Sequence, residues 1–294
     1  MTELAYVNGT FCEPADAKVS IEDRGFQFGD GVYEVVVFYD GKPFLLDRHI
    51  ARLRRSLEAI ELSYDFDAHP IEPVLTEGLR RCGLRDALVY IQITRGACPR
   101  SHLAPDDLSP TTVMTFGQRP VVDEALRAKG AAVMTVRDER WANCFVKAVT
   151  LLPNVLARNR AQRQGYDDAV FVTDSGDVRE CTSANLFVVH EGAILTPPRT
   201  DSVLHGVTQG FVMECAARIG LPIEERRFDV TFLRQSDEVF MSSTTVEVLG
   251  ISRVDDQSIG QGTVGPITTR VHAEFSRSCR CNDDEVAASE RLVS

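Results

Sequence analysis

The sequence predicts a mixed α/β (α+β) protein built from two domains. Its 294 residues are enough for two domains of about 150 residues each. Hydrophobic residues make up 44% of the chain and charged residues 26%, close to the averages of folded globular proteins. Hairpin and helix patterns fill the first half, and strand and helix patterns alternate in the second. Such a mixture is typical of layers in which helices cover sheets.

The chain opens with two hairpin patterns. Residues 5–7 and 10–12 favour strands, and Asn8-Gly9 between them suits a type I′ turn because both residues tolerate a positive φ. A second hairpin is predicted over residues 35–46, where a turn at 39–42 separates two strand-like runs.

A helix is predicted directly after the second hairpin. Asp47 is placed to cap its N-terminus, and Ile50, Leu53, Leu57 and Ile60 recur at helical spacing, which puts them on one face. The other elements predicted for the first half are a helix that ends at Cys82 with Gly83 after it, and strands over residues 87–94 and 111–116.

The domain boundary is predicted near residues 117–124, where Gly, Pro and polar residues interrupt the strand pattern. The predicted domains are residues 1–120 and 121–280. A charged tail over residues 281–294 is poor in aromatic residues and is expected to be disordered. The elements predicted for the second domain are strands over residues 131–136, 169–173, 186–189 and 238–241, and helices over residues 154–164, 207–219 and 267–277.

The composition excludes several classes of protein. Thirty-two Lys and Arg against 43 Asp and Glu give a net charge of −11, which disfavours a nucleic-acid binder. No apolar segment reaches the ~18–20 residues that cross a bilayer, and the N-terminus does not resemble a signal peptide. The eight cysteines and six histidines show no metal-binding spacing. We therefore expect a cytoplasmic protein with reduced thiols that binds neither nucleic acid, membrane nor metal.

Lys147 is the residue that most clearly suggests chemistry. The chain has no GxxxxGK[ST], GxGxxG, HExxH or GxSxG motif. Lys147, however, lies in the apolar run 144–149. Desolvation favours the neutral amine that a Schiff base requires. The alternative is a lysine that reaches solvent from a strand edge.

Three other clusters suit the binding of anions. Arg100 and His102 are two residues apart, so on an extended segment both point the same way and can grip a carboxylate. Hydroxyls follow a predicted strand at 242–245, and 206–208 opens a predicted helix, and both arrangements suit a phosphate. A solvated loop and a plain helix N-cap are the simpler interpretations. Together with Lys147, the clusters favour pyridoxal phosphate chemistry on amino acids.

Six blocks along the chain form a recognisable set. They are residues 22–34 (EDRGFQFGDGVYE), 48–53 (RHIARL), 90–96 (YIQITRG), 180–187 (ECTSANLF), 204–208 (LHGVT) and 243–245 (STT). The set resembles the class IV (fold type IV) aminotransferases, and among them the D-amino acid aminotransferases, over almost the whole chain up to the tail. The resemblance implies a smaller N-terminal α/β domain, a larger C-terminal mixed α/β pseudo-barrel domain and a cofactor in the cleft between them.

The resemblance implies pyridoxal 5′-phosphate as the cofactor and Lys147 as the catalytic residue. Lys147 would form the Schiff base with the cofactor and later carry the proton between the substrate Cα and the cofactor carbon. Glu180 would contact the pyridine nitrogen and keep it protonated. The phosphate ligands implied are Arg52, Val207, Thr208, Ser243 and Thr244, with Leu204 packed on the ring face.

The resemblance also implies a substrate and an assembly. In D-amino acid aminotransferases a tyrosine and an Arg-x-His pair hold the substrate carboxylate, and these residues are Tyr33, Arg100 and His102 here. The implied reaction moves the amino group of amino acids such as D-alanine and D-glutamate to 2-oxo acids by a ping-pong mechanism. Because the Arg-x-His loop of this family reaches the active site of the neighbouring subunit, a homodimer is implied.

Several other activities stay open. Within the same fold they are a branched-chain L-amino acid aminotransferase, an (R)-amine transaminase and aminodeoxychorismate lyase. Branched-chain enzymes of this fold lack the Arg-x-His arrangement, which favours the D-enzyme. A non-catalytic binding protein that kept the cofactor fold is a further alternative, against which Lys147 and Glu180 count. The missing glycine fingerprint disfavours a nucleotide-binding oxidoreductase.

Overall fold

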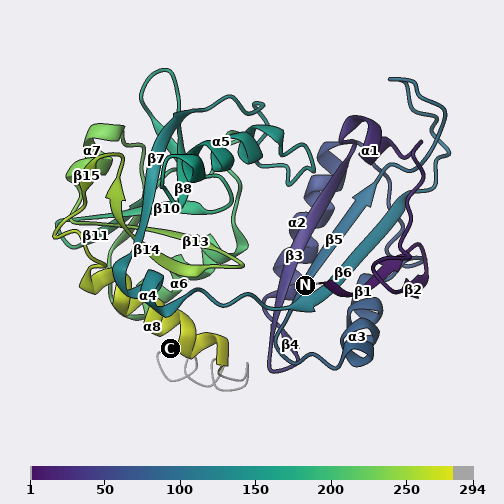
Figure 1. Ribbon diagram of the computed structural model, residues 1–294, viewed down its shortest axis with the longest axis horizontal. Helices are drawn as coiled ribbons and strands as arrows, with labels where there is room; N and C mark the ends of the chain where they lie inside the picture. The colour runs from purple at the N-terminus through teal and green to yellow at the C-terminus, as the bar shows by residue number, and fades with distance from the viewer. Residues whose placement is uncertain (1, 281–294) are drawn as a thin grey trace, which may run out of the picture. The chain divides into compact units, whose positions relative to one another are not determined.

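The chain folds into two compact units in the computed structural model, which describes residues 2–280 (Figure 1). The first unit holds the residues up to Pro120 together with Cys144–Leu151. The second holds Val121–Asn143 and the residues from Leu152 onward. The structure thus differs from the predicted domains, because residues 144–151 belong to the first unit and not to the second. The predicted tail, 281–294, lies outside the described residues.

The first unit is built on a six-stranded antiparallel sheet in the order β2-β1-β6-β5-β3-β4. Helix α2 packs against β3, and helix α3 packs against β1 and β6 (Figure 1). The elements are β1 (Thr2–Val7), β2 (Thr10–Cys12), α1 (Arg24–Phe28), β3 (Gly31–Tyr39), β4 (Lys42–Pro43), α2 (Leu46–Ala59), α3 (Ile71–Cys82), β5 (Ala87–Thr94) and β6 (Thr111–Gln118).

Local sequence explains the strands of this unit. Asn8 and Gly9 have φ angles of 44° and 94° in the turn between β1 and β2, so the first predicted hairpin is confirmed. Along β3, the side chains of Val32, Glu34 and Val36 are fully buried, and the residues between them are only partly buried. This alternation is what a strand with one face on the core requires.

The start of α2 corrects one prediction. The helix begins at Leu46, and its N-cap is Leu45, which has a φ of 53° and makes no side-chain capping bond. Asp47 lies in the first turn instead of capping it. Its negative charge there still interacts favourably with the positive end of the helix dipole. The predicted apolar stripe of this helix packs into the core. α3 ends as predicted, with Gly83 left-handed at a φ of 65°.

Residues 144–151 join the first unit through β3. The N–H of Tyr33 donates to the carbonyl of Lys147 at 2.9 Å, and the N–H of Val149 donates to the carbonyl of Gly31 at 3.1 Å. The segment therefore adds a short antiparallel pairing to the edge of β3, and this pairing ties Lys147 to the first unit.

The second unit contains a nine-stranded mixed sheet in the order β12-β11-β10-β13-β14-β7-β8-β9, with β15 paired to β14. α5 packs against β7 and β8, α6 against β13, and α8 against β13 and β14 (Figure 1). The elements are α4 (Glu124–Lys129), β7 (Ala131–Arg137), α5 (Leu152–Arg163), β8 (Asp168–Val172), β9 (Val178–Cys181), β10 (Asn185–His190), β11 (Ala193–Thr196), α6 (Val207–Arg218), β12 (Ile223–Glu225), α7 (Val230–Gln235), β13 (Glu238–Ser243), β14 (Glu247–Val254), β15 (Gln257–Ser258) and α8 (Pro266–Arg280).

The sequence predicted every helix of this unit that is longer than six residues, but only some of its strands. All four predicted strands correspond to observed strands (β7, β8, β10 and β13), and all three predicted helices to α5, α6 and α8. The additional helices, α4 and α7, are six residues long, less than two turns, which is too short for a helical period to show in the sequence. The additional strands are β9, β11, β12, β14 and β15. None of the helices among residues 2–280 is long and apolar enough to cross a membrane.

Candidate active site

Lys147 lies beside Tyr33 in the first unit. Its Nζ is 4.2 Å from the centre of the Tyr33 ring, and Tyr33 stacks on Tyr90 with ring centres 5.5 Å apart. The N–H of Lys147 donates to the hydroxyl of Ser56 at 3.1 Å. Lys147 is half-buried. The reason is that the segment runs along a strand edge, from which a lysine reaches partly into solvent.

Arg52 is buried and paired with Glu34. Its Nε and Nη2 donate to the two carboxylate oxygens of Glu34 at 2.7 and 2.8 Å, and His49 Nδ1 donates to the same carboxylate at 2.8 Å. The exposed fractions of Glu34, His49 and Arg52 are 0%, 1% and 4%. Ser56, which binds the backbone of Lys147, lies one turn after Arg52 on α2, so this helix brings the arginine close to the lysine segment.

Opposing effects set the charges in this cluster. Burial alone raises the pKa of Glu34, but the charge of Arg52 and the hydrogen bonds from Arg52 and His49 outweigh it and hold that pKa well below its usual range. Burial and the charges of Arg52 and Lys147 lower the pKa of His49, and the hydrogen bond and charge of Glu34 only partly oppose this. At neutral pH the cluster therefore consists of a carboxylate, a neutral imidazole and a guanidinium.

Arg100 and His102 lie on an exposed loop of the first unit, and both contact Phe28. The guanidinium carbon of Arg100 is 4.9 Å from the centre of the Phe28 ring, and the centres of the His102 and Phe28 rings are 5.6 Å apart. The structure therefore brings the two predicted carboxylate ligands together. No hydrogen bond or ring contact joins either of them to Tyr33 within the described part of the chain.

Glu180, at the end of β9 in the second unit, is the centre of a hydrogen-bonded cluster. Its carboxylate is 4% exposed and accepts bonds from Arg140 Nη1 at 2.5 Å, from the N–H of Leu204 at 3.1 and 3.2 Å, and from Asn185 Nδ2 at 3.3 Å. Burial raises the pKa of Glu180, although the charge of Arg140 opposes this effect. Each of its two oxygens thus accepts two of these contacts, so Glu180 is a buried acceptor held by three donor groups.

The N-terminus of α6 adjoins the Glu180 cluster. Val207 and Thr208 form its first turn, where N–H groups and the helix dipole favour an anion. A Cβ at Gly206, the N-cap, would collide with Oδ1 of Asn185. Asn185 is itself held, because its Nδ2 donates to the carbonyl of Leu204 at 2.8 Å. Glycine at this position therefore lets the Asn185 side chain pack directly against the start of the helix.

Ser243 ends β13, the strand against which α6 packs, and Thr244 follows it. The register of β10 and β13 pairs Asn185 with Ser242, which puts this strand end beside the start of β10. The hydroxyl of Ser242 is buried and has no hydrogen-bond partner among the described residues. The second unit thus gathers hydroxyls, a helix N-terminus and a buried carboxylate in one region.

Sequence reasoning missed Glu34, His49 and Arg140. Glu34 interrupts the apolar run of β3, and a carboxylate in such a run indicates a buried cationic partner. His49 lies on the buried face of α2, among residues that pack into the core. Arg140 follows Asp138 and Glu139 in an irregular polar segment, and no pattern distinguishes it from a surface charge.

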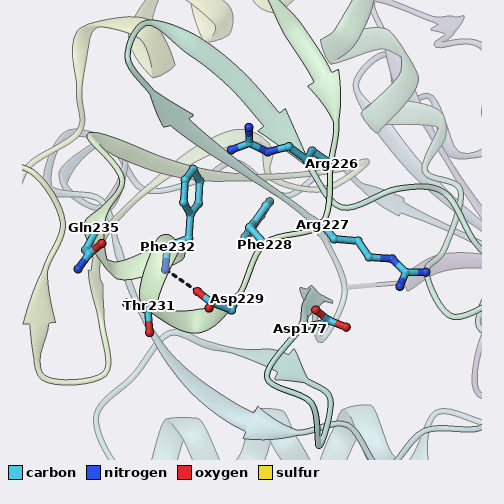
Figure 2. Close-up of a pocket in the computed structure, with 8 residues that line it drawn as sticks. All are labelled: Asp177, Arg226, Arg227, Phe228, Asp229, Thr231, Phe232 and Gln235. Carbon is cyan, nitrogen blue, oxygen red and sulfur yellow. Dashed lines mark hydrogen bonds between the residues drawn. The ribbon is translucent and has the colours of Figure 1, made fainter.

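A separate pocket of about 560 Å³ lies in the second unit. Figure 2 shows its mixed character, with arginine, aspartate and phenylalanine side chains around the opening. Asp229 accepts a hydrogen bond from the N–H of Phe232 at 2.8 Å. The lining residues are Asp177, Arg226, Arg227, Phe228, Asp229, Thr231, Phe232 and Gln235. None of the predicted site residues is among them.

The chain is similar to known proteins over most of its length. The family model for amino-transferase class IV matches residues 31–254. D-alanine aminotransferase of Listeria monocytogenes serotype 1/2a (strain 10403S) is 37% identical over 279 residues, which are 93% of this chain and 96% of the relative. D-alanine aminotransferase of Bacillus licheniformis is 38% identical over 273 residues, which are 92% of this chain and 95% of the relative.

Solved structures match the chain equally broadly. Branched-chain amino acid aminotransferase of Escherichia coli superimposes with a TM-score of 0.85 and 26% identity, over 94% of both chains. A second branched-chain amino acid aminotransferase, from T.th. and solved with pyridoxamine 5′-phosphate, gives a TM-score of 0.85 and 25% identity, over 95% of this chain and 94% of the other.

Proposed function

Because the chain belongs to the class IV aminotransferase family, we propose that it moves the amino group of D-amino acids to 2-oxo acids by a ping-pong mechanism. The aminotransferase activity and the fold type IV, mixed α/β architecture follow from the family match and the solved relatives. The choice of D-amino acids, of the D-alanine or D-glutamate type, is supported by the two D-alanine aminotransferases at 37% and 38% identity. The observation that carries the proposal is the Lys147 amine held 4.2 Å from the Tyr33 ring.

We propose pyridoxal 5′-phosphate as the cofactor, and the chemistry of the donor groups fits it. The buried carboxylate of Glu180 is an acceptor whose negative charge suits a protonated pyridine nitrogen. Leu204 offers an apolar side chain to the ring. The N–H groups and the helix dipole at the first turn of α6 suit a phosphate. The groups proposed to bind the phosphate are Arg52, Val207, Thr208, Ser243 and Thr244.

We propose roles in amino-group transfer for Lys147, Glu180 and Arg140. When bound, the cofactor supplies an electron sink for the electron pair left at the substrate Cα. Lys147 would hold the cofactor through its amine and, once freed by the substrate amine, would carry the proton removed from the substrate Cα. Glu180 holds the proton on the pyridine nitrogen. Arg140 contributes a positive charge that opposes the rise in the pKa of Glu180 caused by burial.

The substrate carboxylate is proposed to bind Tyr33, Arg100 and His102. An arginine grips a carboxylate with two parallel hydrogen bonds, and a histidine adds a single one. The proposed assembly is a homodimer in which the Arg100–His102 loop of one protomer enters the active site of the other. The partner subunit then determines which carboxylates are accepted.

A branched-chain L-amino acid aminotransferase is the second candidate. It is favoured by the two solved branched-chain enzymes, which superimpose at a TM-score of 0.85. Those matches are at 25% and 26% identity, whereas the D-alanine aminotransferases reach 37% and 38%. The higher identity is why we place the D-amino acid substrate first.

The test is the half-reaction of the holoenzyme with single enantiomers, followed by the visible absorbance of the bound cofactor. D-alanine and D-glutamate are expected to discharge the absorbance, and L-leucine and L-alanine are expected to do so much more slowly. A preference for L-leucine would establish the second candidate instead. The Lys147→Ala variant is expected to lose the lysine-bound absorbance band. If that band persists unchanged, the role of Lys147 is wrong.

A further inference from the structure

Arg24 is a buried arginine whose donors reach the loop that carries Arg100 and His102. It lies at the start of α1 and is 5% exposed. Its Nη1 donates to the carbonyl of Ser101 at 2.6 Å, and its Nη2 donates to the carbonyl of His102 at 3.2 Å. Its Nε donates to the carboxylate of Asp30 at 2.8 Å. One guanidinium thus bridges a fixed acid and two consecutive carbonyls of an exposed loop.

The ring of Phe28 contacts the side chains of Arg100 and His102 in the same loop. The guanidinium carbons of Arg24 and Arg100 are each 4.9 Å from the centre of this ring. The His102 ring packs against it with its centre 5.6 Å away, at an interplanar angle of 67°. Arg24 and Phe28 are four residues apart on α1, so one short helix holds the backbone of the loop and contacts both of its functional side chains.

Asp30 keeps Arg24 in place. Burial alone raises the pKa of Asp30, but hydrogen bonds from Arg95 and Arg24 lower it below its usual value, so the acid is ionised. Arg95 Nε shares the same oxygen at 2.9 Å. The other donors of Arg95, however, bind the carbonyls of Ile60 and Glu61, away from the loop. Arg95 therefore carries the same charge as Arg24 and binds the same acid, Asp30. Its side chain donates no hydrogen bond to residues 100–102.

The backbone around Arg24 is also tied to the base of the loop. The N–H of Arg24 donates to the carbonyl of Gly96 at 2.8 Å, and Asp23 and Ala97 form an antiparallel bridge. A Cβ at Gly25 would collide with the methyl group of Thr94, so the close approach of the two segments requires glycine there. The start of α1 and residues 94–102 therefore form one packed module.

We propose that Arg24 is a positioning residue for substrate selection, which fixes the backbone of residues 100–102 and thereby orients Arg100 and His102 toward the substrate carboxylate. The inference rests on the proposed function for its kinetic consequence. The mechanical part, the anchoring of the loop by Arg24, is independent of the reaction. A displacement of a binding group by about 1 Å costs up to ~100-fold in efficiency, so a loosened loop has a large effect on substrates held by their carboxylate.

The experiment compares Arg24→Met, Arg24→Lys and the matched control Arg95→Met. Methionine keeps much of the apolar stem of Arg24 and removes all the hydrogen-bond donors of its side chain. Lysine keeps the charge but cannot bridge Asp30 and two carbonyls at once. Hydrogen exchange of the amides of residues 98–104 reports on the loop without any substrate. The KM and kcat for D-alanine, and the inhibition constant of propionate, which has the carboxylate of D-alanine but no amine, report on recognition.

We expect faster exchange in residues 98–104 for both Arg24 variants and not for Arg95→Met. The KM for D-alanine and the inhibition constant of propionate are expected to rise about 10- to 100-fold together, with a much smaller change in kcat and an unchanged absorbance of the bound cofactor. Unchanged exchange in the loop would overturn the anchoring. Faster exchange with unchanged constants would overturn the role in substrate selection. If the wild-type protein fails to use D-amino acids, the proposed function fails, and the exchange data still decide whether Arg24 anchors the loop.

Discussion

The carboxylate of Glu34 accepts two hydrogen bonds from the guanidinium of Arg52, at 2.7 and 2.8 Å, where both side chains are almost completely buried. The pair joins β3 to α2, the two elements that also hold Tyr33 and the backbone of Lys147. Because a bidentate pair fixes both position and orientation, Glu34 sets the direction of the arginine that we propose as a phosphate ligand.

Removing one member of this pair is expected to destabilise the first unit strongly. Glu34→Ala leaves the Arg52 charge buried without its partner, which costs about 3–5 kcal/mol of unfolding free energy. The double variant Glu34→Leu/Arg52→Met removes both charges and is expected to regain most of that loss. Urea unfolding followed by circular dichroism measures the difference. A double variant no more stable than Glu34→Ala would show that the stability does not depend on charge pairing.

His49 is expected to make the protein less stable as the pH falls below ~6.5. Burial depresses the pKa of native His49, whereas unfolded histidine titrates near 6.5. Between these two values the unfolded chain binds one more proton, so the unfolding free energy decreases with falling pH by up to about 1.4 kcal/mol per pH unit. Glu34, whose native pKa is lowered, adds a loss of the same sign only below about pH 4.3.

The control for this prediction is His49→Asn, whose amide can donate to Glu34 without titrating. Burial raises the pKa values of Asp168 and Glu180, and these groups act with the opposite sign, because their contribution is lost as the pH rises. They are present in both proteins, so the difference between the two stability curves isolates His49. If the unfolding free energies of the wild type and of His49→Asn change in parallel between pH 5 and pH 7, His49 is not the group responsible for the loss of stability.

The sequence indicates single side chains of the proposed site but not the partners that hold them. Lys147 and the Arg100–His102 pair stand out because each contrasts with its neighbours within a few residues. The partner of Arg52 comes from a strand that is distant in sequence, and no local period encodes a pairing between β3 and α2. Only the isolated charge of Glu34 in an apolar run indicates that a buried partner exists.

Local sequence patterns could not predict, for a similar reason, that Lys147 belongs to the first unit. The chain enters the second unit after Pro120 and returns for residues 144–151 alone. Its return depends on backbone bonds from Tyr33 and to Gly31, and every residue except proline offers such bonds. Hydrophobic periodicity reports which face of an element is buried, and it does not report which strand edge a segment joins.

Arg140 is expected to act through Glu180. It donates to Glu180 at 2.5 Å and is held by two bonds of 2.9 Å to Asp138. In Arg140→Met, burial raises the pKa of Glu180 further, so that the acid no longer stabilises a proton on the ring nitrogen. The half-reaction with D-alanine is expected to slow about 100-fold, the lower end of the loss typical of removing one electrostatic contact.

The matched comparison for Arg140 is the pair Glu180→Gln and Arg140→Met/Glu180→Gln, measured by stopped-flow absorbance of the bound cofactor. Because both residues act on one proton, the double variant is expected to be no slower than Glu180→Gln alone. Multiplicative losses would mean that Arg140 acts elsewhere.

The sharing of active sites between protomers is testable with mixed dimers. Lys147→Ala removes the reacting amine, and Arg100→Ala removes the carboxylate ligand, so each homodimer is expected to be nearly inactive with D-alanine. In a heterodimer of the two variants, a loop that enters the partner's site leaves one site with both residues missing and the other with both intact. About half of the wild-type activity per dimer is then expected, because one of two symmetric sites works.

The heterodimer is obtained by co-expressing the two chains with different affinity tags and purifying on both tags in turn. A wild-type/Lys147→Ala heterodimer, prepared identically, gives the activity expected of a single intact site. If Arg100 acts within its own chain, both sites of the mixed dimer lack one residue, and its activity stays at the level of the inactive homodimers. If no doubly tagged species forms, the protein is not a dimer. Both an inactive mixed dimer and the absence of a doubly tagged species would contradict the shared site. Recovery to the level of the control requires that Arg100 and Lys147 of different protomers act on one substrate molecule.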